Sequence, residues 1–284
     1  MGNLGRRVGF AVIAIPAAAA IVWLGCVALA ALLALIAGLA AWEFYRLARA
    51  DGVRAFAGAG IALSALIPIV VHTNYVGDTA IPLDAGALAL LALFGVAVWR
   101  RAAERPLSAV AATVFGVLYT GGTLSFGYAL RYHRFVIGPA AGTALVGLPL
   151  VLTWATDTGG FAIGRWLGRT KLMPAVSPAK TVAGAVGGLA FGLAATVAYV
   201  AYVLKPYAHL ALTPAGMALF ALVASATAQV GDLAESMLKR EAGVKDSSSL
   251  IPGHGGVLDR FDSMFFVLPV SFVLLSELLI VIPQ

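Results

Sequence analysis

The sequence predicts an all-α, polytopic integral membrane protein with about nine transmembrane helices, its N-terminus in the cytoplasm and its C-terminus outside. Three observations support this fold class: 61% of the 284 residues are hydrophobic, only 11% are charged, and the mean hydropathy is +0.95. Soluble domains carry about a quarter charged residues, so this chain has too few polar side chains to cover a water-soluble globule. The composition excludes an ordinary soluble enzyme, a disordered chain and a fibrous repeat.

The helices are predicted from the length of the apolar runs. A helix that crosses about 30 Å of hydrocarbon needs roughly 20 apolar residues. Cutting the chain at charges, prolines and glycine clusters leaves nine segments, at 8–24, 27–47, 57–72, 83–99, 108–130, 140–157, 182–204, 214–238 and 263–282. The run 8–41 is too long for a signal peptide, and no polar domain follows it.

The basic residues predict the orientation. With the N-terminus inside, only Arg131, Arg134 and Lys205 of the 19 Lys and Arg residues fall in outside loops, as the positive-inside rule expects. The net charge of +6 therefore reports topology. No basic cluster is interleaved with aromatic residues on a polar domain, so nucleic-acid binding is not expected. A single cysteine, Cys26, excludes a disulfide framework and a zinc cluster.

We expect one membrane domain, residues 1–284. The N-terminal helices, in residues 1–140, are expected to be mainly scaffold, and residues 141–284 are expected to carry the catalytic helices and the cytoplasmic loops. Polar residues concentrate in 157–180 and 229–262, both on the predicted cytoplasmic side. Glu43 and Arg46, at the inner end of the second segment, are interpreted as an interface anchor.

The first polar group lies at the inner end of segment 214–238. Asp232, Glu235, Ser236 and Lys239 follow the spacing i, i+3, i+4, i+7, which places them on one helix face. Ionisable groups in membrane helices usually face a protein interior or a wet cavity. The structural alternative is a helix end with an internal Glu–Lys pair, but Asp232 lies well inside the basic end.

The second group is the stretch 245–262, whose Gly, Ser and Pro content predicts a loop with backbone amides open to an anion. Asp259 and Asp262 follow at i, i+3. If the last two helices are antiparallel neighbours, Asp232, Asp259 and Asp262 meet near the cytoplasmic boundary. Carboxylates without His or Cys suit Mg²⁺ held together with substrate phosphates.

Structural alternatives exist for two residues of this stretch. Asp259 beside Arg260 also fits a helix N-terminal charge next to a topology anchor. A lone His254 is more often an ordinary loop histidine than a ligand.

The third group runs from Asp157 to Gly184. Asp157 ends an apolar segment, and the small residues after it permit close packing or tight turns. Ser177-Pro178 before Lys180-Thr181 is typical of a loop that starts a helix, where free amides favour phosphate. Ordinary packing of small residues in lipid is the alternative for this group.

Motifs of other enzyme classes are absent. The sequence has no G-x-x-x-x-G-K-[ST] phosphate loop and no G-x-G-x-x-G after a strand, so neither a P-loop NTPase nor a dinucleotide fold is indicated. It has no G-x-S-x-G elbow either, which argues against a serine lipase.

The run S-M-L-K-R-x4-K-D-S-S-x2-I-P-x-H-G-G-V-x-D-R-F-D at 236–262 resembles the phosphatidate cytidylyltransferases, also called CDP-diacylglycerol synthases. D-T-G-G-F-x-x-G-R at 157–165 and S-P-x-K-T at 177–181 fit the same family. The resemblance covers the C-terminal half strongly and the N-terminal half in general character.

The resemblance implies a reaction in which CTP and phosphatidate give CDP-diacylglycerol and pyrophosphate, with Mg²⁺ as cofactor; a second cation is left open. A phosphatidate oxygen would attack the α-phosphorus of CTP in line. Because a phosphate monoester is largely dianionic at neutral pH, no protein nucleophile is required. Positioning and charge neutralisation would supply most of the rate.

The expected site residues follow from the resemblance and the polar groups. The carboxylates expected to bind or orient metal are Asp232, Asp259, Asp262 and Glu235. The basic residues expected to hold phosphates are Lys180, Lys239, Arg240, Lys245 and Arg260. Asp232, Lys239, Asp259 and Lys245 are expected to carry catalysis. Further residues expected at the substrates are Ser177, Thr181, Asp246, His254, Gly255, Gly256, Asp157 and Arg165, with Asp157 either a ligand or a partner of Arg165.

The expected partners are CTP, phosphatidate entering sideways from the lipid bilayer, and, from family likeness, a second copy in a homodimer. Short loops and the lack of a transit peptide favour a bacterial inner membrane, with the site facing the cytoplasm. The alternative is a transporter or lipid scramblase with an intramembrane acidic cation site. It predicts inverted repeats in both halves, whereas the polar motifs lie in one half.

Overall fold

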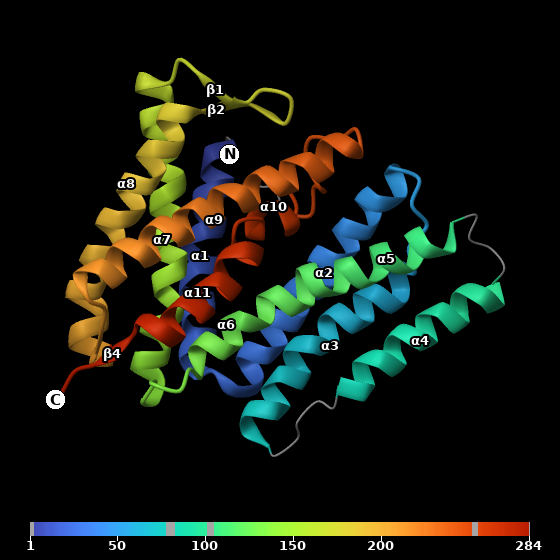
Figure 1. Ribbon diagram of the computed structural model, residues 1–284, viewed down its shortest axis with the longest axis horizontal. Coiled ribbons are helices and arrows are strands. Elements are labelled where there is room, and N and C mark those ends of the chain that lie inside the picture. Colours follow the sequence, from blue (N-terminus) through green and yellow to red (C-terminus); the bar gives the residue numbers. More distant parts are fainter. Residues whose placement is uncertain (1–2, 78–82, 101–104, 252–254, 284) are drawn as a thin grey trace. The chain divides into compact units, whose positions relative to one another are not determined.

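The computed structural model is mostly helical and describes residues 3–77, 83–100, 105–251 and 255–283. Each of the nine predicted apolar segments coincides with a helical stretch (Figure 1). Within the described residues, seven helical stretches are long and apolar enough to cross a membrane, and Val12–Leu24 forms a shorter apolar helix. The helical, polytopic architecture is therefore confirmed, whereas the count of nine spans and their orientation stay predictions.

The chain divides into two compact units, described separately below. The first comprises Met1–Ile13, Cys26–Tyr128 and Leu238–Arg260, and the second comprises Ala14–Gly25, Ala129–Met237 and Phe261–Gln284. Each unit therefore combines segments that are far apart in the sequence.

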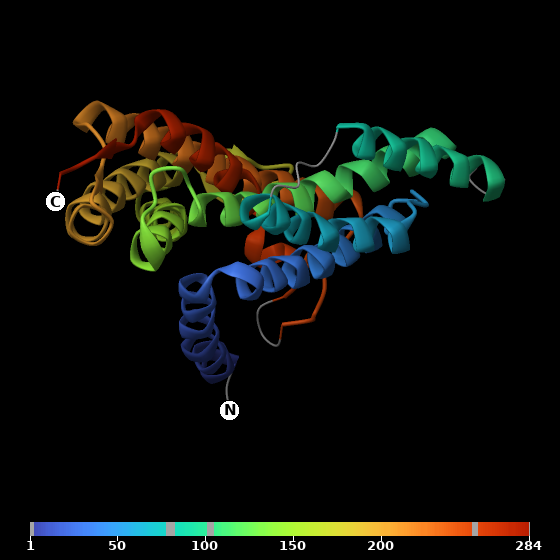
Figure 2. The same cartoon turned by 90° about the horizontal axis from the view of Figure 1, so that it is seen from below.

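The longer helices of the first unit run alongside one another (Figure 2). They are α2 (Cys26–Ala50), α3 (Ala57–Val76), α4 (Leu83–Arg100), α5 (Pro106–Val117), the π-helical η1 (Leu118–Gly122), most of α6 (Thr123–Arg131) and the short α10 (Leu258–Phe261). Small residues allow close approach: the Tyr45 hydroxyl donates to the Thr113 carbonyl at 2.7 Å, and a Cβ at Gly116 would lie 2.6 Å from the Tyr45 hydroxyl.

The second unit is built around the pair α7 and α8. Its elements are the C-terminal part of α1 (Asn3–Leu24), α7 (Gly138–Leu167), β1 (Lys171–Met173), β2 (Ser177–Thr181), α8 (Val182–Tyr199), η2 (Val200–Ala208), β3 (Leu210–Ala211), α9 (Pro214–Glu241) as far as Met237, α11 (Met264–Leu278) and β4 (Ile280–Val281). Hydroxyl contacts join its helices, for example Thr156 Oγ1 donating to Ser225 Oγ at 2.9 Å.

Two features differ from the sequence prediction. Helix α7 continues to Leu167, ten residues beyond the predicted end, because the small residues after Asp157 pack on α8 instead of forming turns. The stretch before α8 is an antiparallel hairpin, in which Lys171 pairs with Thr181 and Met173 with Ser177. Together with β3–β4, this adds two small two-stranded sheets to a fold predicted to be wholly helical.

Candidate active site

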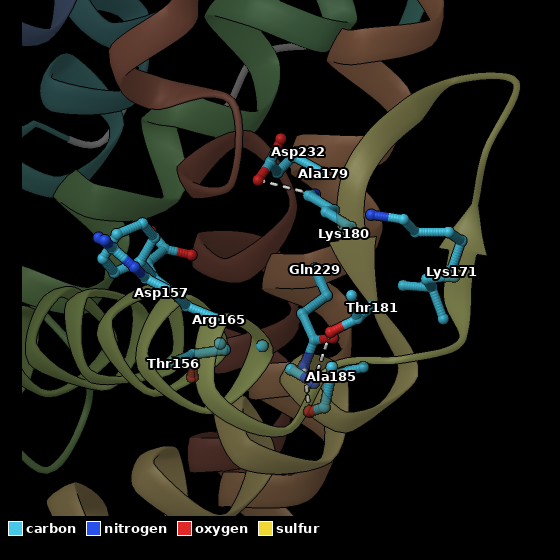
Figure 3. A pocket seen from close by; sticks show the side chains of 16 residues that line it. Thr156, Asp157, Arg165, Lys171, Ala179, Lys180, Thr181, Ala185, Gln229 and Asp232 are labelled. Carbon is cyan, nitrogen blue, oxygen red and sulfur yellow. Dashed lines mark hydrogen bonds and ion pairs between the residues drawn. The ribbon is translucent and has the colours of Figure 1, made fainter.

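The hairpin β1–β2 carries Lys180 to the C-terminal half of α9. Lys180 Nζ lies 2.7 Å from Asp232 Oδ2, and the two side chains are 25% and 35% exposed. Figure 3 shows them pointing toward each other across the space between strand and helix. The sequence predicted both residues for the site, and the structure brings them together as an ion pair.

A cavity of about 530 Å³ surrounds this pair, and every residue that lines it belongs to the second unit. This volume lies within the usual range for small-molecule sites. Three basic side chains line it, Arg165, Lys171 and Lys180, against two acidic ones, Asp157 and Asp232 (Figure 3). A cavity with both signs of charge can hold a phosphate and a cation side by side.

One face of α7 forms a wall of the cavity. Asp157, Gly160, Phe161, Gly164 and Arg165 line it, and their spacing is that of a single helix face. The D-T-G-G-F-x-x-G-R stretch is part of helix α7, and the helix therefore presents these residues to the cavity together.

Glycines bring α7 and α8 together at the cavity. A Cβ at Gly184 would lie 2.7 Å from the Gly160 carbonyl oxygen and 3.1 Å from Gly164 Cα, both of them backbone atoms. The Thr181 hydroxyl accepts a hydrogen bond from Gly184 N at 3.1 Å, so it caps α8. The buried Thr181 is therefore held by the helix start, and that start borders the cavity.

Thr156, Lys171 and Gln229 also line the cavity, although the sequence analysis assigned them no role. Gln229 Nε2 donates to the Ala185 carbonyl at 3.1 Å, which ties α9 to the first turn of α8 (Figure 3). The available signal for Gln229 was its place at the start of the polar stretch 229–262. No such signal pointed to Lys171, because the strand that pairs with β2 was not predicted from the sequence.

The first unit holds a second lysine–carboxylate pair. Lys239 Nζ lies 2.8 Å from Asp259 Oδ1, with side chains 13% and 5% exposed. Asp259 Oδ2 also accepts from Ser247 N at 3.0 Å, from the Ser247 hydroxyl at 2.9 Å and from Gly256 N at 2.8 Å. Asp259 therefore organises the loop that precedes it.

The sequence predicted Glu43 to be an interface anchor. This prediction is wrong, because the Glu43 side chain is fully buried. Its carboxylate accepts from the hydroxyls of Ser247 and Ser248 and from the backbone N–H groups of Val257 and Leu258. The interface interpretation failed because these donors lie more than 200 residues away, where no local pattern reveals them.

Gly255 and Gly256 have backbone reasons to be glycine. Gly255 has φ +81°, which side chains rarely adopt, and Gly256 is packed so closely that a Cβ would lie 2.5 Å from Glu43 Oε2. Their predicted contact with substrate stays a prediction.

The remaining predicted residues lie apart from the cavity lining. Ser177 lies on β2, outside the cavity lining, and Glu235 is fully buried in α9. Arg240, Lys245, Asp246 and Arg260 are exposed, with Arg240 Nη1 donating to the Val244 carbonyl at 3.2 Å. His254 lies outside the described residues. The backbone of Asp262 approaches α9, since a Cβ at Gly231 would lie 2.8 Å from the Asp262 carbonyl.

The fit of Mg²⁺ differs among the predicted ligands. Asp232 borders the cavity and is one-third exposed, so its oxygens suit a hard cation. Both Asp259 oxygens are already engaged by protein donors. Among the residues that the structure describes, no three His, Cys, Asp or Glu side chains form a metal-binding group. The meeting of Asp232 with Asp259 and Asp262 stays a prediction.

The comparisons with known proteins agree with these features. A family model described as "Cytidylyltransferase family" matches residues 5–278. A phosphatidate cytidylyltransferase of Synechocystis sp. is 30% identical over 296 residues, covering 96% of this chain and 97% of the relative. Phosphatidate cytidylyltransferases of Bacillus subtilis and Staphylococcus epidermidis are 44% identical over 128 residues and 39% over 171 residues, covering 45% and 58% of those relatives. This chain belongs to the cytidylyltransferase family.

Proposed function

We propose that the protein is a CTP:phosphatidate cytidylyltransferase, which transfers CMP from CTP to phosphatidate and releases pyrophosphate in phospholipid biosynthesis. The observation that carries the proposal is the cavity with three basic side chains and the Lys180–Asp232 pair. Both substrates are polyanions that must approach each other, so a site for them needs basic side chains and a cation-binding carboxylate. Family membership and the name shared by the three relatives add support.

In the proposed mechanism the protein positions the reactants. A phosphatidate phosphate oxygen forms a bond to the α-phosphorus of CTP, and the bond from that phosphorus to the β-phosphate oxygen breaks, so pyrophosphate leaves. Lys180, Arg165 and Lys171 would hold the phosphates against repulsion. Lys239, Lys245, Arg240 and Arg260 remain further candidates for phosphate contacts. Charge stabilisation of this kind is usually the largest contribution to phosphoryl transfer.

Mg²⁺ is the proposed cofactor, with Asp232 its best-placed ligand and Asp259, Asp262 and Glu235 proposed to complete or orient the site. When bound, it would neutralise charge on the triphosphate. Asp157 would either join that set or pair with Arg165. Ser177 and residues 254–256 are proposed to close over the nucleotide, and Asp246 is proposed to lie at the substrates.

We further propose that the protein lies in a bacterial cytoplasmic membrane with the cavity facing the cytoplasm, and that it works as a homodimer. The distribution of basic residues supports the orientation. The dimer rests on family likeness.

The test is pyrophosphate release by the purified protein in detergent. We expect release only when CTP, phosphatidate and Mg²⁺ are all present, and we expect CDP-diacylglycerol in equal amount. Omission of each component in turn and addition of a chelator are the controls. A well-folded protein that releases no pyrophosphate would refute the proposal.

A further inference from the structure

The buried carboxylate of Glu43, on α2, has no part in the cavity, yet it accepts four hydrogen bonds from the loop before α10 and from the start of that helix. Its exposed fraction is 0%. It accepts from Ser247 Oγ at 3.0 Å, Ser248 Oγ at 2.5 Å, Val257 N at 3.0 Å and Leu258 N at 2.6 Å. Figure 2 shows the orange part of this loop near the blue α2.

The same loop holds the second lysine–carboxylate pair. The Ser247 hydroxyl lies 3.0 Å from Glu43 and 2.9 Å from Asp259, so its single proton can be donated to either carboxylate. Asp259 in turn accepts from Lys239 Nζ at 2.8 Å. A continuous path of three short contacts therefore joins Glu43 to the Lys239 ammonium, entirely within the first unit.

A packing role alone does not account for this arrangement. Burying a carboxylate costs several kcal/mol unless donors compensate it, and apolar side chains of similar volume often pack at least as well. Here the compensation comes from loop donors, and the loop backbone passes so close that Gly256 has no room for a Cβ. The contacts of Glu43 therefore fix where the loop lies, and with it Asp259.

We propose that Glu43 is a positioning residue for the cytidylyl transfer: through Ser247 and Asp259 it sets the position of the Lys239 ammonium for a substrate phosphate. This inference rests on the proposed function and adds a residue from the N-terminal part of the chain to the reaction. Glu43 itself touches no substrate.

The principal test is Glu43→Gln in a kinetic cycle with Lys239→Ala. Glutamine keeps the size of the side chain but replaces one acceptor oxygen by a donor that faces other donors. We expect kcat/KM for CTP to fall at least tenfold in Glu43→Gln. In the Lys239→Ala background the same substitution should lower kcat/KM for CTP by no more than about twofold, because the effects of residues that act through one path are not additive.

A matched control separates positioning from stability. Ser64 is fully buried in the same unit and accepts from Thr120 Oγ1 at 3.1 Å, so Ser64→Ala removes a buried polar contact that does not involve the loop. We expect it to keep wild-type kcat/KM. Hydrogen exchange gives a readout independent of activity: the amides of Val257 and Leu258 should lose protection in Glu43→Gln and keep it in Ser64→Ala.

If Glu43→Gln does not insert stably, Ser247→Ala carries the test, because it removes the shared hydroxyl and leaves Glu43 in place. We expect a three- to tenfold loss of kcat/KM, again absent in the Lys239→Ala background. Wild-type kcat/KM in Glu43→Gln or Ser247→Ala, or losses that add fully to that of Lys239→Ala, would overturn the inference. An inactive wild-type protein would instead overturn the proposed function.

Discussion

Asp232 and Asp259 are both paired with a lysine, but their surroundings give them different chemistry. Asp232 is 35% exposed beside a cavity, whereas Asp259 is 5% exposed and accepts further hydrogen bonds from Ser247 and Gly256. A carboxylate that borders a cavity can bind a cation in place of its lysine partner. A carboxylate enclosed by backbone donors keeps its hydrogen bonds and its position. We therefore propose Asp232 as the first ligand of the cation.

The Asp232→Asn variant should lose turnover on the order of 100-fold, the usual effect of removing one electrostatic group from a reaction centre. Its dependence on Mg²⁺ concentration should shift to higher values, because a neutral amide binds the cation less well. Steady-state rates over a Mg²⁺ titration measure both effects. Asp51→Asn, the same change at an exposed turn, is the control; normal turnover and Mg²⁺ dependence in Asp232→Asn would refute the assignment.

At the residue scale, the sequence pointed to a candidate region only where the signal was local. The spacing of Asp232 and Lys239 on one helix, and the dense polar run after it, point to their region without a structure. Glu43 lacked such a signal, because a single glutamate between Trp42 and Phe44 matches an ordinary helix end. Its role depends on donors supplied by a distant loop.

At the scale of elements, the contact of α7 with α8 shapes the cavity wall. We expect Gly184→Ala to lower the unfolding free energy by about 1–3 kcal/mol, the usual cost of overpacking, because the new methyl group meets backbone on α7. Activity should fall as well, since the helix start borders the cavity. Thermal unfolding in detergent and pyrophosphate release measure the two effects.

Gly58→Ala is the matched control for that variant. A Cβ at Gly58 meets nothing within 4 Å, and alanine favours a helix over glycine. We expect stability equal to or slightly above wild type; a Gly184→Ala protein that matched it in both measurements would contradict the packing argument.

The link between α6 and α7 is predicted to be sensitive to pH. Burial, and then the neighbouring Arg134, hold the pKa of His133 below its usual 6.5, and the ring lies 3.0 Å from the Ser276 hydroxyl of α11. As pH falls through 6.5, the unfolded state binds more protons than the folded state, so the unfolding free energy decreases.

Unfolding midpoints at pH 7.5 and 5.5 test this expectation. The wild-type midpoint should drop at the lower pH, and His133→Gln should show a smaller drop. His209→Asn removes an exposed imidazole and should respond as the wild type does. An equal drop in all three proteins would argue against His133 as the source.

Hydropathy predicted the positions of the helices, because long apolar runs bounded by charges, prolines and glycine clusters mark them. It did not predict the end of α7, since Gly and Thr residues fit a turn or a packed helix equally well until the face of α8 is known. The hairpin β1–β2 was not predicted for a similar reason: its strands of three and five residues show no clear alternation of apolar and polar residues.

At the scale of the whole molecule, the orientation is a testable prediction from charge. A fusion of alkaline phosphatase to the C-terminus should be enzymatically active, because the predicted C-terminus lies outside. A fluorescent protein that folds only in the cytoplasm should stay dark there. The same reporters fused after Arg169 should give the opposite pattern, and matching signals at both points would refute the predicted topology.

The long separation between Glu43 and its donors affects how the chain is made. Its partners follow it by 204 to 215 residues, which at about 5–20 residues per second means about 10–40 s of translation. During that time the Glu43 carboxylate lacks the four donors that hold it in the folded protein. The early helices are therefore inserted before these contacts can form. The first unit is completed only after residues 247–258 have been synthesised.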